Sequence, residues 1–421
     1  MRPQNEITQP EPLHNKEDGS LLNPGFSRRP YQVYDRSLVR AWPRCLRLKE
    51  WDYYLVSDGA CALCLTIADL GYSGLYSVSL IDFGTSSSSS GLRDLLLGTR
   101  DGRKGFAAPE GSRASSKTAS AIRFFPLGRT DLPTTSTEGV SCYEGGGMRL
   151  RFTVSKSSSR SASTSKTGEK TERRRLEVFV KDFVNGAPLS ADIVLTDEPR
   201  DSMVIATPFG PRHRGSFFYN RKIVGMRAKG SFTLGGTTHI FDPDPHALTP
   251  GPALGLLDWG RGVWTRDNTW YWAAAHGYHH NHTTADGQMQ KKIIIGFNLG
   301  YGFGDTSAAT ENMFFVDGVA HKLGDVDFGI PDDDDNSPGK EPSYLKQWRF
   351  TSKDEDEDEK RLDMVFDPIV DRTDYINHAN LVVSDQHQVM GRCKGRVVLD
   401  DGAVLEFENL LATAEKIRNK W

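Results

Sequence analysis

The sequence lacks several features that would place it in a membrane or in an oxidising compartment. It has no run of about 18 consecutive apolar residues, the length that a membrane-spanning helix needs. Its first residues, MRPQNEITQPEPLHNKEDGS, are polar and acidic and contain no apolar signal-peptide core. Five cysteines in 421 residues are an odd and sparse set for a disulfide framework. We therefore expect a soluble cytoplasmic protein.

Charge of one sign is also lacking. The 52 basic and 55 acidic residues leave a net charge of −3, so the whole chain has no electrostatic attraction to nucleic acid. The sequence contains no P-loop, no G-x-S-x-G and no H-E-x-x-H motif. We expect no nucleic-acid partner, no cofactor and no metal ion. Cys61 and Cys64 fall in a strand-like segment, where buried packing is the favoured role.

What the sequence has in abundance is short β-strand patterns. MRLRFTVS, RLEVFVKDF, ADIVL, SFTLGG, KKIIIGFNLGYGF and NMFFVDG are rich in β-branched and aromatic residues and are bounded by turn residues. In LEVFV, residues 176, 178 and 180 share one face. No series of helical patterns separates the strands, which disfavours a parallel sheet. The pattern predicts an all-β, antiparallel fold.

One helix is predicted, at the C-terminus. Leu410, Leu411, Ala414, Ile417 and Trp421 follow helical spacing. Between the strand patterns lie Ser-rich or charge-rich segments, which we expect to be disordered loops because they cannot bury enough apolar surface. They are residues 84–94, 111–120, 155–174, 331–341 and 352–361.

A weak internal repeat suggests two similar halves. KGSFTLGGTTHIF, from Lys229, and KGRVVLDDGAVLEF, from Lys394, share a strand–turn–strand pattern that ends in Phe241 and Phe407. We place the boundary near GSFFYNRKI. This gives an N-terminal β unit of residues 1–215 and a C-terminal β unit of residues 216–421.

Three polar clusters on apolar strands are candidate sites, and together they indicate an apolar pocket with a few polar groups. The first is GLLDWGRGVW followed by TWYW. The second is GFNLGYGFGDTSAATEN, and the third is SDQHQVMGR. The residues expected to act chemically are Asp258, His387 and Asp305. The residues expected to contact a ligand are Trp259, Arg261, Trp264, Trp270, Trp272, Asn298, Glu311 and Asn312.

The role of Asp258 depends on Arg261. A carboxyl in apolar surroundings has a raised pKa and can donate a proton near neutrality. A facing Arg261 would instead hold Asp258 charged, as a structural ion pair or a ligand clamp. In the first case His387 or Asp305 would be the base and the tryptophans would form the pocket wall. The sequence leaves both roles open, and structural pairing is favoured.

Several of these segments together resemble the family known as domain of unknown function 2804, which occurs in bacteria and fungi. They include LKEWDYYLVS, ADLGYSGLYSVSLIDF, GLLDWGRGVW, TWYWAAA, SDQHQVMGR and EKIRNKW. The Ser-rich and acidic insertions suggest a fungal member. The LDWGRGVW…TWYW pattern is also similar to lipocalin-like two-barrel proteins such as carotenoid hydratases, fungal pericyclases and survival factors. That resemblance implies two lipocalin-like (calycin-type) barrel halves.

The leading functional hypothesis is enclosure of a hydrophobic small molecule or lipid, with cofactor-free hydration, isomerisation or cyclisation as the candidate reactions. One alternative is a non-catalytic lipid carrier. A second is a glycan hydrolase that uses Asp258 with Asp305 or Glu311. A third is a scaffold in which DWGRG only locks a barrel. The oligomeric state is not indicated.

Overall fold

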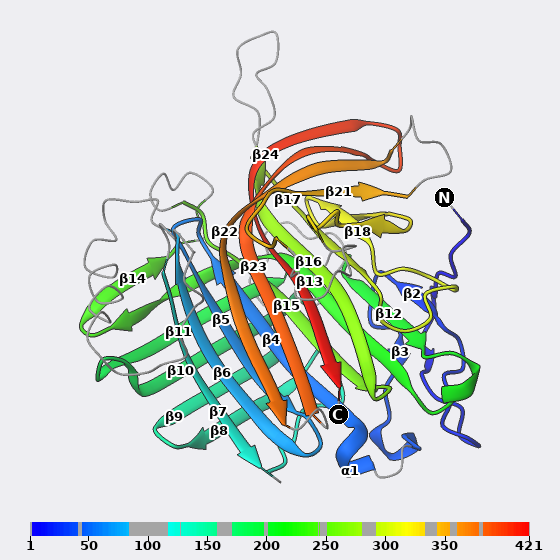
Figure 1. Ribbon diagram of the computed structural model, residues 1–421, viewed down its shortest axis with the longest axis horizontal. Coiled ribbons are helices and arrows are strands. Elements are labelled where there is room, and N and C mark those ends of the chain that lie inside the picture. The colour runs from blue at the N-terminus through cyan, green and yellow to red at the C-terminus, as the bar shows by residue number, and fades with distance from the viewer. Residues whose placement is uncertain are drawn as a thin grey trace.

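A computed structural model shows a chain built almost entirely of antiparallel strands in two large curled sheets (Figure 1). It describes residues 2–40, 44–83, 117–126, 128–157, 171–197, 201–242, 244, 251–279, 292–332, 343–353, 360–378 and 382–420. The predicted all-β, antiparallel fold class is confirmed.

The first sheet contains 13 strands, of which ten form a continuous hydrogen-bonded path. In spatial order these are β7 (Lys117–Pro126), β6 (Ser73–Asp82), β5 (Cys61–Asp69), β4 (Leu48–Ser57), β15 (Leu254–Val263), β13 (Phe217–Leu234), β11 (Ala187–Asp197), β10 (Thr171–Val184), β9 (Met148–Ser157) and β8 (Gly139–Gly145). Three further strands attach beside this path: β12 (Met203–Pro208) and β14 (Thr237–Phe241), which pair with β13, and β2 (Gly25–Ser27), which pairs with β12.

The second sheet contains nine strands. In spatial order these are β19 (Val319–Lys322), β18 (Met313–Val316), β17 (Ile293–Tyr301), β16 (Asp267–His279), β24 (Val404–Lys420), β23 (Val382–Val398), β22 (Leu362–His378), β21 (Trp348–Ser352) and β20 (Val326–Asp327). The remaining elements are short: the parallel pair β1 (Glu11–Pro12) and β3 (Gln32–Val33), the helix α1 (Arg44–Arg47), and the 3-10 turns η1 (Arg36–Leu38) and η4 (Pro211–His213).

Strand alternation explains how each sheet builds its own core. In β10, Leu176, Val178 and Val180 share one face and are buried in the core enclosed by the first sheet. The second sheet encloses a separate core that includes Trp348, Phe350 and Phe366. The two fully formed cores agree with the expectation of two curled β halves.

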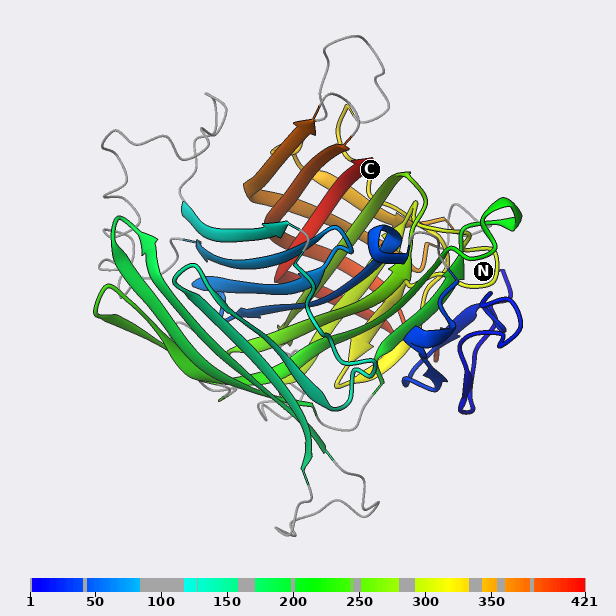
Figure 2. The same cartoon turned by 90° about the horizontal axis from the view of Figure 1, so that it is seen from below.

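The two sheets also pack against each other, face to face (Figures 1 and 2). Strands β4, β5, β13 and β15 of the first sheet meet β16, β22, β23 and β24 of the second through a third apolar cluster. These strands are therefore covered on both faces, one inside their own sheet and the other at the inter-sheet interface.

The predicted C-terminal helix is wrong. Residues 404–420 form the strand β24, which lies between β16 and β23 in the second sheet. Leu410, Ala412 and Ala414 enter the second core, whereas Leu411 faces the first sheet. Because both faces of β24 are buried, its apolar residues do not alternate with polar ones, and their spacing imitates a helix. Trp421, the last member of the predicted helix, lies outside the described residues.

The chain passes from the first sheet to the second between Val263 and Asp267. The sequence prediction divides the chain after residue 215 instead, although β13, β14 and β15 pair within the first sheet. The repeat segments form two hairpins, β13–β14 and β23–β24, and their terminal phenylalanines Phe241 and Phe407 enter the first and second cores.

Most of the predicted loop insertions lie outside the described residues. At their edges, strands extend further than the composition suggested. Residues 117–120 belong to β7, and residues 171–174 belong to β10. Charged or serine side chains in these stretches thus form part of strand ends, where backbone pairing decides the conformation.

Candidate functional site

Asp258 and Arg261 lie on opposite faces of β15. Side chains alternate along a strand, so residues three positions apart point in opposite directions. Leu257, Trp259 and Val263 enter the first core, and Arg261 lies on their side of the strand. Asp258 lies on the side of Leu256, which faces the second sheet. The pair proposed from the sequence therefore does not form.

Arg261 is a structural residue of the first sheet. Its guanidinium is completely buried, donates to Asp52 Oδ1 at 3.1 Å and to the carbonyl oxygen of Pro133 at 2.7 Å, and lies 3.7 Å from Glu50 Oε1. It also lies 4.1 Å from the ring centre of Trp259. Trp259 is buried in the same core. Both residues thus lie away from the face that carries Asp258.

Asp258 belongs to a polar cluster at the inter-sheet interface. Its Oδ1 accepts hydrogen bonds from Trp51 Nε1 at 3.1 Å and from Asn220 Nδ2 at 2.6 Å, and its Oδ2 lies 3.7 Å from Lys222 Nζ. All of these residues come from adjacent strands β4, β15 and β13. A Cβ at Gly260 would lie 2.0 Å from the Trp51 ring, so this glycine lets the indole lie across β15.

Lys222 joins the two sheets. Its Nζ donates to Glu311 Oε2 at 3.0 Å and lies 4.4 Å from the ring centre of Trp272. Asn298 donates to the same Glu311 oxygen at 3.1 Å and accepts from Trp272 Nε1 at 2.8 Å. Three of the predicted contact residues, Trp272, Asn298 and Glu311, therefore meet Asp258 through one buried lysine.

Glu415 is a site residue that the sequence analysis missed. It lies on β24, on the face turned toward the first sheet, and part of its surface stays accessible. Burial between the sheets raises its pKa to about 8, and the Asp258 carboxylate adds to this shift against the opposing charges of Lys222 and Arg372. Glu415 therefore holds its proton near neutrality, next to a second carboxyl.

Unpartnered polar atoms gather around this cluster. Within the described part of the chain, Tyr53 Oη, Asn220 Oδ1, Gln388 Oε1 and Thr413 Oγ1 are buried without a hydrogen-bond partner. Strand alternation puts Gln388 and Thr413 on the same face as Glu415, and Tyr53 packs against Trp272. Buried polar groups normally have partners, so four such atoms at one interface favour a ligand or ordered water there.

A small apolar pocket lies beside the polar cluster, between the same strands. Its free space of about 10 Å³ fits a single water molecule, so a larger ligand requires the two sheets to move apart there. Its wall includes Leu55, Leu256, Met390 and Leu411. Leu256 precedes Asp258 by two residues on β15, and Thr413, also in the wall, precedes Glu415 by two residues on β24. Since alternate residues of a strand lie on one face about 7 Å apart, the apolar wall continues directly into the carboxyl pair.

His276 closes the other side of this pocket. Its Nε2 lies 3.0 Å from Ser57 Oγ across the two sheets, and its Nδ1 is buried without a hydrogen-bond partner. Burial lowers its pKa to about 4, so the imidazole is neutral. His276 belongs to the histidine-rich segment HGYHHNH; His280 and His282 of that segment lie outside the described residues.

An aromatic group adjoins Asp258 on the opposite side. The Trp264 ring centre lies 5.4 Å from that of Trp51 and 5.6 Å from that of Trp270, with Phe303 packed against both Trp264 and Trp270. Three of the four tryptophans proposed as a pocket wall, Trp264, Trp270 and Trp272, thus flank the inter-sheet interface. Trp259 does not.

His387 lies on the far face of the second sheet. Its Nδ1 is 2.7 Å from Asp371 Oδ2, its Nε2 is 3.6 Å from Asp385 Oδ1, and its ring stacks on Tyr344 at 3.8 Å. Its neighbour Gln388 points toward the inter-sheet interface, so His387 points away from it. The structure therefore does not bring His387 to Asp258.

Asp305 and Asn312 also have partners elsewhere. Asp305 Oδ1 accepts from the Ser307 backbone N–H, and this hydrogen bond lowers the pKa of Asp305. Asn312 is buried, accepts from Gly300 N at 2.7 Å and donates to Gly324 O at 2.8 Å, which holds a loop of the second sheet. Neither residue contacts the polar cluster.

The chain belongs to the DUF2804 family. The family model, described as a domain of unknown function, matches residues 4–421. A search of curated proteins finds no match. The helices of the described residues include none with the length and apolar character needed to cross a membrane.

Several solved structures align with most of this chain but have low sequence identity to it. CghA shares 8% identity, with a TM-score of 0.40 over 99% of this chain and 97% of the other. CghA with Sch210972 shares 9% identity, with a TM-score of 0.41 over 97% of each chain. A protein of Nitrosomonas europaea assigned to AttH shares 10% identity, with a TM-score of 0.39 over 94% of this chain and 99% of the other.

Proposed function

We propose that the DUF2804 chain encloses an apolar small molecule or lipid between its two sheets and moves a proton on it without a redox cofactor. The observation that carries the proposal is the pair of carboxyls at the end of the apolar pocket: Glu415 protonated, and Asp258 held by Trp51, Asn220 and Lys222. A carboxyl with a raised pKa beside a second, hydrogen-bonded carboxyl is an arrangement from which acid–base roles are assigned.

In this proposal Glu415 is the general acid and Asp258 is the general base. Glu415 gives its proton to one atom of the bound molecule, and Asp258 takes a proton from another atom or from water. The proton taken by Asp258 then returns to Glu415, so that both carboxyls are regenerated. The net reaction is an isomerisation or cyclisation when Asp258 takes that proton from the substrate, and a hydration when it takes it from water. Lys222 and Arg372 balance the charge that remains on the two carboxyls.

The apolar wall would orient the ligand. Leu55, Leu256, Met390 and Leu411 suit a hydrocarbon segment. The unpartnered Tyr53 Oη and Gln388 Oε1 offer hydrogen bonds to a polar group of the ligand. One ligand could then pack a hydrocarbon segment against the apolar wall and direct its polar group toward Tyr53 and Gln388.

The test begins with the protein's own ligand. The purified chain is extracted with organic solvent, and the extract and the intact complex are examined by mass spectrometry. Wild type, Glu415→Gln and Asp258→Asn are then incubated with a cellular lipid extract. We expect wild type to convert at least one compound into a product of equal mass or of mass increased by one water. Both variants should bind that compound and lose turnover by at least about 100-fold.

His387→Gln is the matched control, since His387 lies on the far face of the second sheet. We expect it to retain turnover. Full activity of Glu415→Gln would overturn the assignment of Glu415 as the general acid. Loss of activity in His387→Gln alone would mean that the active site lies in the interior of the second sheet. If a lipid is bound but neither wild type nor any variant changes it chemically, the result would instead support a non-catalytic lipid carrier.

A further inference from the structure

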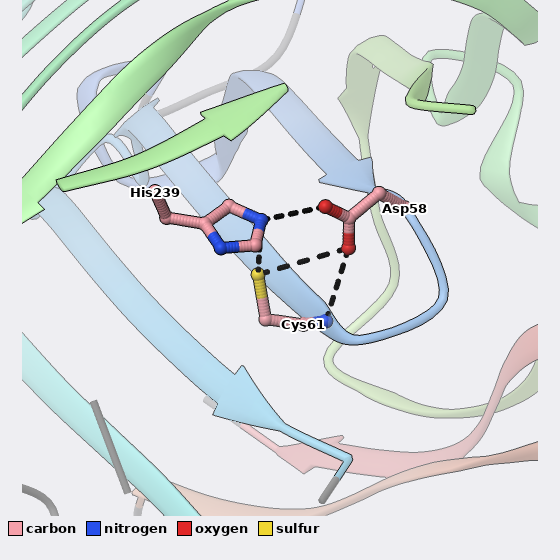
Figure 3. A group of neighbouring side chains, drawn as sticks. All are labelled: Asp58, Cys61 and His239. Atoms are coloured by element: carbon pink, nitrogen blue, oxygen red, sulfur yellow. Dashed lines mark hydrogen bonds and ion pairs between the residues drawn. The ribbon is translucent and has the colours of Figure 1, made fainter. Parts of the chain in front are cut away.

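A second group of chemically reactive side chains lies at the turn between β4 and β5. Asp58 comes from this turn, Cys61 is the first residue of β5, and His239 comes from β14 (Figure 3). Cys61 faces the first core, whereas Cys64, three residues later, faces the inter-sheet interface. The group is therefore separate from the carboxyl pair of Asp258 and Glu415.

The three side chains point their ligating atoms at one another (Figure 3). His239 Nε2 lies 2.6 Å from Asp58 Oδ2 and 3.5 Å from Cys61 Sγ, and Cys61 Sγ lies 3.9 Å from Asp58 Oδ1. Both contacts of the imidazole use the same nitrogen. In a catalytic triad, one ring nitrogen contacts the nucleophile and the other contacts the carboxylate. His239 does not have this arrangement, so the geometry does not favour Cys61 as a nucleophile.

The backbone and neighbouring rings hold this arrangement. Asp58 Oδ1 accepts the backbone N–H groups of Ala60 and Cys61 at 3.1 and 3.2 Å. Gly59, with φ of +86°, permits the turn that brings these residues together. The His239 ring stacks on Phe232 at 5.1 Å. The three ligating groups are thus oriented before any ligand arrives.

The surroundings of this group are buried and contain a further carboxyl. Asp58 and Cys61 are buried, and Asp82, the direct cross-strand partner of Cys61, is buried as well. Cross-strand partners share a face, so Asp82 is on the same side of the sheet as Cys61. Burial, Asp58 and Asp82 raise the pKa of the Cys61 thiol.

We propose that Asp58, Cys61 and His239 form a binding site for a divalent transition-metal ion of the zinc type. One carboxylate, one thiolate and one imidazole are ligands that zinc commonly takes, and a water molecule would complete a tetrahedral set. Tetrahedral zinc sites separate such ligand atoms by about 3.3–3.8 Å. The Cys61–His239 distance of 3.5 Å fits this range, the Cys61–Asp58 distance of 3.9 Å must shorten slightly, and the His239–Asp58 contact of 2.6 Å must widen.

The ion would fasten β14 to the first sheet. Among the described strands, β14 pairs with β13 alone, and its other edge has no strand beside it. A metal bound by His239 and the β4–β5 turn would tie this edge to the centre of the sheet.

The test titrates the metal-free full chain with Co²⁺ and Zn²⁺. We expect one equivalent of Co²⁺ to give thiolate-to-cobalt charge-transfer absorption, and Zn²⁺ to displace it and raise Tm. Cys61→Ala should abolish the absorption. His239→Ala, at a partly exposed position that tolerates truncation, should weaken Zn²⁺ binding by at least about 100-fold.

Cys64→Ala and Cys142→Ser are the controls, because one thiol is buried on the opposite face of β5 and the other is exposed. Both should keep the absorption. Absence of a stoichiometric Co²⁺–thiolate signal in wild type, or its persistence in Cys61→Ala, would overturn the proposal. Binding without thiolate absorption would assign the ion to other side chains, such as surface histidines.

Discussion

At the residue scale, the separation of three positions from Asp258 to Arg261 decides the roles of these two residues. A separation of three places two strand residues on opposite faces, and the segment GLLDWGRGVW is a strand. The alternation rule alone would therefore have placed Arg261 on the face of the strand opposite to Asp258 and the candidate site. No rule of spacing would have found Glu415, because its pKa depends on burial between the sheets and on Asp258 and Lys222, which lie far away in sequence.

Arg261 supplies the residue-scale prediction. Its charge is buried against two buried carboxylates, Asp52 and Glu50. Arg261→Met would leave Asp52 without its cation, whereas Glu50 keeps Arg36 at 2.9 Å. We therefore expect the free energy of unfolding to fall by about 3–5 kcal/mol, as measured by urea denaturation.

An exposed arginine gives the matched control. Arg349 pairs with Asp363 at 2.9 Å but keeps 62% of its side chain exposed. Because solvent screens such a pair, Arg349→Met should lower stability by less than about 1 kcal/mol. Equal effects at the two positions would contradict the structural role assigned to Arg261.

At the element scale, the strands with one covered face were predictable and the strands with two covered faces were not assigned reliably. The alternation in β10 is visible in the sequence because one face of the strand meets solvent. In β24, Leu410 and Leu411 are both buried, so the period of two disappears. The helix prediction failed because tertiary packing, which the local sequence does not encode, covers the second face of β24.

The register of β24 can be tested by cross-linking. Ala275 of β16 and Ala412 of β24 are Cα partners in the antiparallel pair. Because such partners lie within the range of a disulfide, the double substitution Ala275→Cys and Ala412→Cys should cross-link on mild oxidation. The product is measured by mass spectrometry of peptides under non-reducing conditions.

Moving one cysteine by a single residue provides the control. Ala275→Cys with Thr413→Cys places the thiols on opposite faces of the sheet, and we expect no cross-link. Efficient cross-linking of this second pair, or none of the first, would mean that β24 has another register or conformation.

At the scale of the whole molecule, the sequence predicted two β halves but not the way they meet. Residues assigned to a common pocket proved to be divided among two sheet interiors and the interface between them. Trp272, Asn298 and Glu311 meet Asp258 at that interface, whereas His387 does not. Which face of one sheet covers which face of another is a long-range choice, and no local pattern along either strand records it.

The interface should make global stability depend on pH. The pKa of Glu415 is raised from its ordinary 4.5 to about 8 in the folded chain, so the folded state binds a proton that the unfolded state releases. The contribution of Glu415 is fully present below pH 4.5 and is lost as the pH rises through about 8. As the pH rises across this range, the unfolding free energy of wild type should therefore fall relative to that of Glu415→Gln.

Denaturant unfolding of both proteins between pH 4.5 and 9 measures this difference. His276, whose pKa is lowered to about 4, makes the folded state more stable as pH rises from about 4 to 6.5. That contribution is common to both proteins and cancels in the comparison. A constant difference between wild type and Glu415→Gln would argue against a protonated Glu415.

The position of the last strand in each sheet bears on how the chain is made. β15 is the last strand of the first sheet in chain order and inserts between β4 and β13, while β24 is the last of the second and inserts between β16 and β23. A nascent chain leaving the ribosome thus carries each sheet as an open precursor until its final strand arrives. Asp258 lies on one of these closing strands and Glu415 on the other. The carboxyl pair therefore comes into existence only when both sheets have closed, so a partly synthesised chain has no assembled site with which to capture a ligand.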